Sequence, residues 1–136
     1  MALKYNNMQH KQYLEMIDGV GHNWVEVFKG NTDFYSAAYW DLLTSIWRVD
    51  GPVRKTDALR YMTGIKSAHT ASKYVDYSIR QGILLETENP DDARSKLLTL
   101  SDDMRQRLDS FFDAAVSRVR RANQAIDEKG PSPEDP

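Results

Sequence analysis

The feature that most constrains the fold is a pair of short helical segments separated by a tight turn. Residues 55–62 and residues 67–81 each place apolar side chains three and four positions apart, which is the period of one helix face. Thr63-Gly64 interrupts the pattern between them, and Gly82 takes the position of a helix C-cap after the second segment. Two short helices joined by a turn that contains glycine predict a helix-turn-helix.

The hydrophobic period then changes from 3.6 to two. Residues 83–88 and residues 95–100 are short apolar runs with alternation, and Asn89-Pro90-Asp91-Asp92 between them is rich in turn-forming side chains. This pattern predicts a β-hairpin directly after the second short helix.

Further helices are predicted on both sides of this segment. Residues 8–28 carry an apolar stripe despite Gly19 and Gly21, and a second helix is expected to begin at Thr32 or Asp33 and to end before residues 50–52. After Ser101, which can cap, the apolar positions continue at helical spacing for about seven turns.

The expected fold class is therefore mainly α with a small β-hairpin wing (α+β), a winged helix-turn-helix flanked by N- and C-terminal dimerisation helices. The expected parts are an N-terminal dimerisation helix over 1–31, a DNA-binding lobe over 32–100 with its wing at 83–100, a long C-terminal dimerisation helix over 101–128 and a disordered, proline-rich tail over 129–136.

A family resemblance rests on residues 70–108. The matching positions are a small polar helix start with a basic residue, a Val-Asp pair, a glycine before an aliphatic residue, a turn of the type Asn-Pro-Asp-Asp-x-Arg and a Leu-Ser helix opening: Thr70, Ser72, Lys73, Val75, Asp76, Gly82, Ile83, residues 89–94, Leu100 and Ser101. This pattern resembles the MarR family of bacterial transcription regulators. The resemblance implies a homodimeric winged-helix regulator, usually a repressor, that binds double-stranded DNA at a pseudo-palindromic operator.

The residues themselves support a nucleic-acid interface. Once the inward face of the second short helix (Ala68, Ala71, Tyr74, Val75, Ser78) is removed, polar and basic side chains suited to base edges and phosphates face outward. These are Lys66, Ser67, His69, Thr70, Lys73 and Tyr77. Arg54 and Lys96 are further phosphate candidates, and the resemblance implies that Asp92 orients Arg94 toward a minor groove. Each of these cations also fits an ordinary solvated surface position, and His69 fits either interpretation equally.

The apolar stripes predict a dimer interface, and the aromatic residues suggest an effector site. The interface is expected to involve Leu14, Ile17, Trp24, Phe28, Leu108, Phe111, Ala115 and Val119. The family resemblance implies a small aromatic effector, for which the candidates are Trp24, Tyr39, Trp40 and Trp47. Packing in the core or the interface is the alternative role for each of these four.

Charge and composition narrow the function. The chain has 18 basic and 20 acidic side chains, but residues 52–100 carry eight basic against six acidic ones while both flanking segments are net negative. The absence of cysteine excludes disulfides, thiolate metal sites and a thiol switch. The start of the chain lacks an apolar targeting segment, so no membrane association and a cytoplasmic location are expected.

No enzyme is predicted. The three histidines (His10, His22, His69) lack metal-ligand spacing, Asp91-Asp92 is turn chemistry, and no glycine-rich phosphate loop or nucleophile motif occurs, so we expect no metal and no cofactor. A sequence-specific DNA-binding regulator is the main hypothesis. The alternative is a winged helix that serves as a protein-interaction module without specific DNA binding.

Overall fold

The computed structural model describes residues 2–134 and divides the chain into two compact units. The first unit combines residues 1–30 with residues 108–136, so both ends of the chain build it, and the second unit comprises residues 31–107. Met1, Asp135 and Pro136 lie outside the described residues. The second unit therefore contains the whole of the predicted helix-turn-helix and wing.

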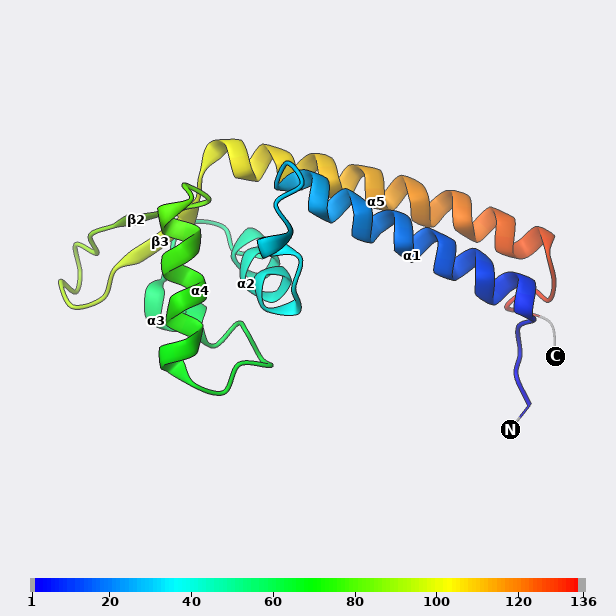
Figure 1. Cartoon of the computed structure of the whole chain (residues 1–136), viewed down its shortest axis with the longest axis horizontal. Helices are drawn as coiled ribbons and strands as arrows, with labels where there is room; N and C mark the ends of the chain where they lie inside the picture. The colour runs from blue at the N-terminus through cyan, green and yellow to red at the C-terminus, as the bar shows by residue number, and fades with distance from the viewer. Residues whose placement is uncertain (1, 135–136) are drawn as a thin grey trace. The chain divides into compact units, whose positions relative to one another are not determined.

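Two long helices form the first unit. Helix α1 (Asn7–Val27) runs antiparallel to the part of α5 (Asp102–Glu128) that follows Leu108, and Figure 1 shows the two side by side. The Trp24 ring packs edge-on against Phe111, with 5.4 Å between ring centroids. The guanidinium group of Arg118 on α5 lies against Gly19, in the space that a larger side chain would occupy.

A buried glutamine joins the far ends of these helices. Gln9 is 2% exposed and completes a capping box with Asn6 at the start of α1. Its Nε2 also donates to the Ile126 carbonyl (3.0 Å) and the Pro131 carbonyl (2.9 Å), which lie at and just beyond the end of α5. Lys4 Nζ donates to the Pro133 carbonyl at 2.6 Å. Lys129, Pro131 and Pro133 thus have defined partners, while the disorder expected for the 129–136 tail stays a prediction.

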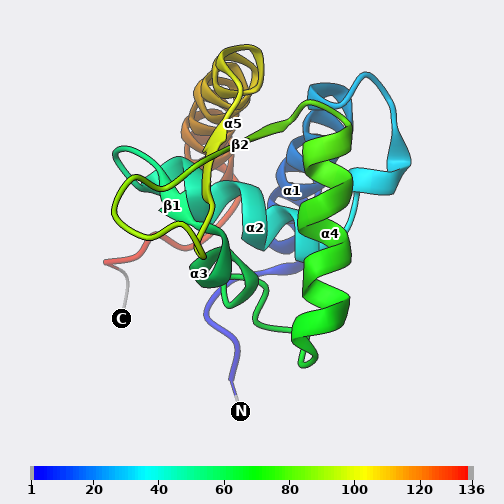
Figure 2. The ribbon, with the colours of Figure 1, turned by 90° about the vertical axis from the view of Figure 1, so that its left-hand side faces the viewer.

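The second unit is a small sheet covered by short helices. Its elements are η1 (Thr32–Phe34), α2 (Ala37–Arg48), β1 (Val53–Arg54), α3 (Lys55–Leu59), α4 (Ala68–Arg80), β2 (Leu84–Thr87) and β3 (Leu97–Leu100). The three strands are antiparallel in the order β1-β3-β2. Figure 2 shows α3, α4 and the β2–β3 hairpin of this unit from the side that the left of Figure 1 presents. The predicted fold class, mainly helical with a hairpin wing, is confirmed.

Two elements differ from the sequence prediction. The second helix begins at Ala37, because Ser36 accepts a hydrogen bond from the Tyr39 amide (3.4 Å), while Thr32 belongs to the short η1 turn that Asn31 caps. Strand β1 was not predicted, since two residues are too short to show a period; Val53 and Arg54 pair with Leu98 and Leu97.

The buried face of α4 attaches this helix to the unit. Ala71, Val75 and Ser78 are at most 1% exposed, and the Ser78 hydroxyl donates to the Tyr74 carbonyl (3.0 Å), so no polar group is buried without a partner at this position. The inward placement of Ala68 was wrong: it is exposed because it is the first residue of α4 and lies before the packed face.

Candidate nucleic-acid interface

The first turns of α4 present polar and basic side chains to solvent. Ser67 caps the helix by accepting from the Thr70 amide (3.4 Å), and the first turn contains no acidic residue. The side chains predicted to face outward here are exposed: Lys66, Ser67, His69, Thr70 and Lys73. The positive end of the helix dipole and the two lysines therefore both attract an anion to the start of α4.

The two lysines are free of counter-charges. No acidic residue occurs between Asp57 and Asp76 in the sequence. Among the described residues, neither Lys66 nor Lys73 has a carboxylate within ion-pair distance. An anion that approaches α4 would therefore not have to displace an internal partner.

The tip of the wing is ordered by two side chains that accept from the backbone. Asn89 Oδ1 accepts from the Asp91 amide and Asp92 Oδ1 from the Arg94 amide, both at 3.0 Å. Asp92 Oδ1 also lies 3.4 Å from Arg94 Nε, while the Arg94 side chain is 94% exposed. The contact expected between Asp92 and Arg94 is thus present, and it leaves the guanidinium group open to solvent.

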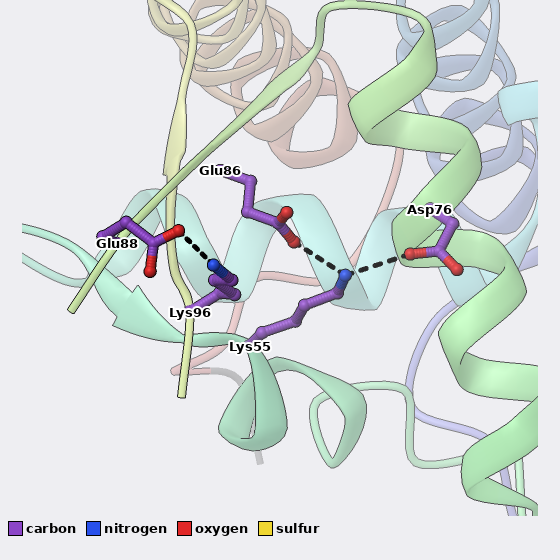
Figure 3. Close-up of polar contacts among 5 residues, drawn as sticks. All are labelled: Lys55, Asp76, Glu86, Glu88 and Lys96. Atoms are coloured by element: carbon purple, nitrogen blue, oxygen red, sulfur yellow. Dashed lines mark hydrogen bonds and ion pairs between the residues drawn. The ribbon is translucent and has the colours of Figure 1, made fainter. Parts of the chain in front are cut away.

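The cations at the base of the sheet are paired within the chain. Arg54 Nε contacts Asp57 Oδ2 at 3.0 Å. Lys96 Nζ contacts Glu88 Oε1 across the hairpin (Figure 3). Both side chains had been predicted as phosphate contacts from their positions alone. Each would have to leave a carboxylate before binding a phosphate.

A third cation, Lys55, was missed by the sequence analysis. Its Nζ lies between Glu86 Oε2 (2.7 Å) on β2 and Asp76 Oδ1 (3.1 Å) on α4 (Figure 3). Burial by itself lowers the pKa of Lys55, but the hydrogen bonds with Glu86 and Asp76 outweigh it and leave the pKa above its usual value. Asp76 lies 21 positions and Glu86 31 positions after Lys55, so no local spacing in the sequence indicates the contact.

Tyr77 does not face outward as predicted. Its ring stacks on Phe34 with 5.3 Å between centroids, and its hydroxyl donates to Asp33 Oδ2 at 3.0 Å. Tyr77 is partly buried because η1, which the sequence analysis placed within a longer helix, packs against this end of α4. The corrected position makes Tyr77 part of the scaffold behind the exposed surface.

The same aromatic cluster contains Tyr39, which is 6% exposed. Its ring contacts Phe34 and Tyr74 at centroid distances of 4.7 and 5.0 Å. Burial, followed by the nearby Tyr74, Tyr77 and Asp33, raises the pKa of Tyr39 to about 12. Tyr39 therefore stays neutral in the folded protein at any ordinary pH.

The four effector candidates lie in different surroundings. Trp24 is buried in the first unit and Tyr39 in the second, whereas Trp47 is partly buried and Trp40 is 39% exposed. Two cavities, of about 420 and 260 Å³, lie in the first unit, and neither is lined by any of these four residues. The assignment of an aromatic effector to these side chains stays a prediction.

The predicted dimer residues fall into two groups. Trp24, Phe28, Leu108 and Phe111 are already buried within the single chain, and Ala115 is partly buried. Leu14 is 56%, Ile17 41% and Val119 49% exposed, and Met8, Tyr13 and Val116 of the same unit are also exposed. The apolar surface of the first unit is therefore only partly covered by its own chain.

Residues 2–134 carry neither a cluster suited to a metal ion nor a helix suited to a membrane. In this part of the chain no cluster of three or more His, Cys, Asp or Glu side chains is arranged to hold a metal ion. None of its helices combines the length and apolar character needed to cross a membrane.

Comparison with known proteins places the fold. No family model and no curated protein matches the sequence. A transcriptional regulator from Thermotoga maritima is 18% identical, with 89% of this chain and 82% of that chain covered and a TM-score of 0.59. AbsC, a MarR family transcriptional regulator from Streptomyces coelicolor, is 14% identical, with 99% and 86% covered and a TM-score of 0.56.

A third solved structure, reduced AbfR bound to DNA, is 18% identical, with 82% of this chain and 78% of that chain covered and a TM-score of 0.52. All three similarities cover more than four fifths of this chain. The chain therefore has the winged-helix fold of the MarR-family regulators, as the motif over residues 70–108 predicted.

Proposed function

We propose that this chain is a sequence-specific, double-stranded-DNA-binding transcriptional regulator. The observation that carries the proposal is the exposed start of α4. A capped helix N-terminus, two lysines without a carboxylate partner in the described part of the chain, and the side chains of Ser67, His69 and Thr70 occur together there. Lysines and amide groups bind phosphates, and short polar side chains at the start of a helix reach base edges in the major groove.

The wing supplies a second contact in this proposal. Arg94 is exposed at the tip of the hairpin and is oriented by Asp92, so its guanidinium group can enter a minor groove beside the site of α4. Arg54 and Lys96 contribute less, because Asp57 and Glu88 neutralise them in the free protein. Tyr77 contributes through the position of α4 rather than by contact.

The protein acts as a homodimer in this proposal. Leu14 and Ile17 on α1 and Val119 on α5 are exposed apolar side chains, and a second copy of the chain would bury them. A two-fold dimer presents two α4 helices about one DNA turn apart, which requires a pseudo-palindromic operator. A bound dimer covers its operator, and for this reason we propose repression. We also propose a cytoplasmic location, because a regulator of this kind must reach the genomic DNA.

We also propose that the regulator responds to a small aromatic ligand. Such a ligand would act by favouring one spacing of the two α4 helices over another, which is a population shift. Trp40 is the preferred contact, because it is the most exposed of the four candidate residues. Quenching of tryptophan emission by simple phenols, lost in Trp40→Phe but kept in Trp47→Phe, would identify that contact.

The experiment that tests DNA binding is selection of genomic fragments by the purified protein, followed by titration of a selected and an unrelated fragment. We expect tighter binding to the selected fragment by about a thousandfold or more, with affinity that falls steeply as salt rises. Failure to select any fragment would favour the alternative, a protein-interaction module. A reporter gene placed behind the selected fragment then decides between repression and activation.

The dimer is tested separately by measuring mass in solution. Ile17→Glu places a charge in the proposed interface and should give monomers at micromolar concentration. Leu85→Glu is the matched control, because Leu85 is also an exposed apolar residue (48%) but lies on β2 in the other unit. A monomeric parent protein, or equal dissociation of both variants, contradicts the proposed interface.

A further inference from the structure

Lys55 connects three elements that carry the proposed interface. Its backbone amide donates to the Lys96 carbonyl at 2.8 Å, which attaches the start of α3 to the end of the wing. Its side chain bridges Glu86 on β2 and Asp76 on α4 (Figure 3). The first residue of α3 thus contacts both the wing and α4.

The positions of its partners relate this bridge to both proposed DNA contacts. Asp76 follows Lys73 by three residues, so it lies one turn further along α4. Glu86 is part of β2, the strand that leads directly into the loop carrying Arg94, and it pairs in register with Leu98 of β3. A movement of the wing relative to α4 would lengthen at least one of the two ion pairs.

Lys55 itself is poorly placed to bind DNA. Its side chain is only 27% exposed, and its ammonium group already has two carboxylate partners within 3.1 Å. Lys66 and Lys73, by contrast, are exposed and have no carboxylate partner within residues 2–134. The charge of Lys55 is therefore balanced by Asp76 and Glu86 within the second unit.

We propose that Lys55 is a positioning residue that fixes α4 and the wing relative to each other, and so controls the selectivity of DNA binding without touching DNA. This inference rests on the proposed function. Selective binding requires α4 and Arg94 to reach their grooves together, whereas nonspecific binding requires only positive charge. Loss of the bridge should consequently reduce selective binding more than nonspecific binding.

The two carboxylates allow a test in which simple electrostatics and positioning predict opposite signs. Glu86→Gln and Asp76→Asn each remove one negative charge from the unit, so electrostatics alone would tighten binding to every DNA. The positioning role predicts that each weakens binding to the selected operator by about threefold to tenfold, while binding to unrelated DNA is unchanged or slightly tighter.

Glu88→Gln is the matched control. It makes the same charge change on the same hairpin but releases Lys96 instead of Lys55, and it should tighten binding to both DNAs. Lys55→Met should reproduce the loss of selectivity, and Lys55→Arg, which keeps the charge and can still bridge two carboxylates, should restore at least half of it.

The outcomes separate this inference from the function on which it rests. If the parent protein selects no DNA fragment, both fall. If the parent protein is selective but Glu86→Gln and Asp76→Asn tighten binding to both DNAs as Glu88→Gln does, the proposed function stands and the role of Lys55 is overturned. Thermal melts establish that each variant is folded, and should Glu86→Gln not fold, Asp76→Asn with the Lys55→Met and Lys55→Arg pair decides in the same way.

Discussion

The start of α4 and the base of the sheet both carry cations, but they use them differently. Lys66, just before α4, and Lys73 on α4 are exposed and have no carboxylate partner among the described residues. Arg54, Lys55 and Lys96 at the sheet are all paired within the chain. Positive charge in one region is available to a ligand, and in the other it holds structure together. The count of basic residues is therefore a poor measure of binding capacity, and the contacts of each residue are a better one.

The largest expected effect comes from removing the two most exposed cations of the proposed interface. Lys73→Ala and Arg94→Ala should each weaken binding to the selected operator by about tenfold, because Lys73 has no carboxylate partner among the described residues and the Arg94 side chain stays 94% exposed beside Asp92. Arg54→Ala should change affinity by about twofold or less, because Asp57 already balances Arg54. Titration of labelled operator by all three variants checks the difference, and an equal loss in all three would break the comparison.

The next prediction concerns Tyr39 of α2, whose buried ring packs against Tyr74 of α4. Tyr39 ionises near pH 10 when unfolded but only near pH 12 when folded, so its contribution to stability is complete below pH 10 and is lost as pH rises toward 12. The free energy of unfolding should fall by about 2 to 3 kcal/mol over that interval from this group. Denaturant titrations at several pH values should show a smaller fall in Tyr39→Phe.

Tyr13→Phe is the control for this prediction, because the Tyr13 side chain is 54% exposed whereas that of Tyr39 is buried. It should follow the parent protein over the whole pH range. If Tyr39→Phe loses stability with pH as steeply as Tyr13→Phe, burial of the Tyr39 phenol is not the cause.

Tyr77→Phe tests whether Tyr77 supports α4 by packing or contacts DNA. The variant keeps the ring stacked on Phe34 and loses only the hydrogen bond to Asp33, so unfolding should become easier by about 1 kcal/mol while operator affinity changes less than about twofold. Denaturant unfolding and DNA titration are measured on the same preparation. A marked loss of affinity with unchanged stability would return Tyr77 to the DNA-contacting surface.

The smallest expected effect is a gain. Glu88→Gln converts a paired cation of the wing, Lys96, into a free one, so affinity for any DNA should rise by about twofold to fivefold at low salt. Glu134→Gln removes the same charge from the first unit and should leave DNA affinity unchanged. A similar gain in both variants would mean that net charge alone matters.

Most of the fold could be predicted, because its helices and strands differ in hydrophobic period and are bounded by turn and cap residues. The turn at Thr63-Gly64, the C-cap at Gly82 and the change to alternation after it determine the helix-turn-helix and hairpin locally. Strand β1 could not be predicted, because two residues form a strand only through pairing with β3, which lies more than forty positions away. The η1 turn was missed because Asn31 and Ser36 are both good caps, and the sequence does not show that both are used.

The candidate site was predictable in its residue types but not in its electrostatics. Exposed positions at the start of α4 follow from helical period, and the turn at the wing tip follows from Asn89 and Asp92. The pairing of Lys55 with Asp76 and Glu86 depends on the tertiary fold, as does the stacking of Tyr77 on Phe34. Sequence spacing therefore identifies which groups can bind an anion, and only the fold shows which of them are free to do so.

The most direct test of the central claim is the salt dependence of operator binding. Each cation that binds a phosphate displaces about 0.9 counterion, so the slope of log affinity against log salt should become shallower by about 1 in Lys73→Ala. The slope of Arg54→Ala should stay within experimental error of the parent protein. Equal slopes for Lys73→Ala and the parent, or an equal change in Arg54→Ala, would contradict the account.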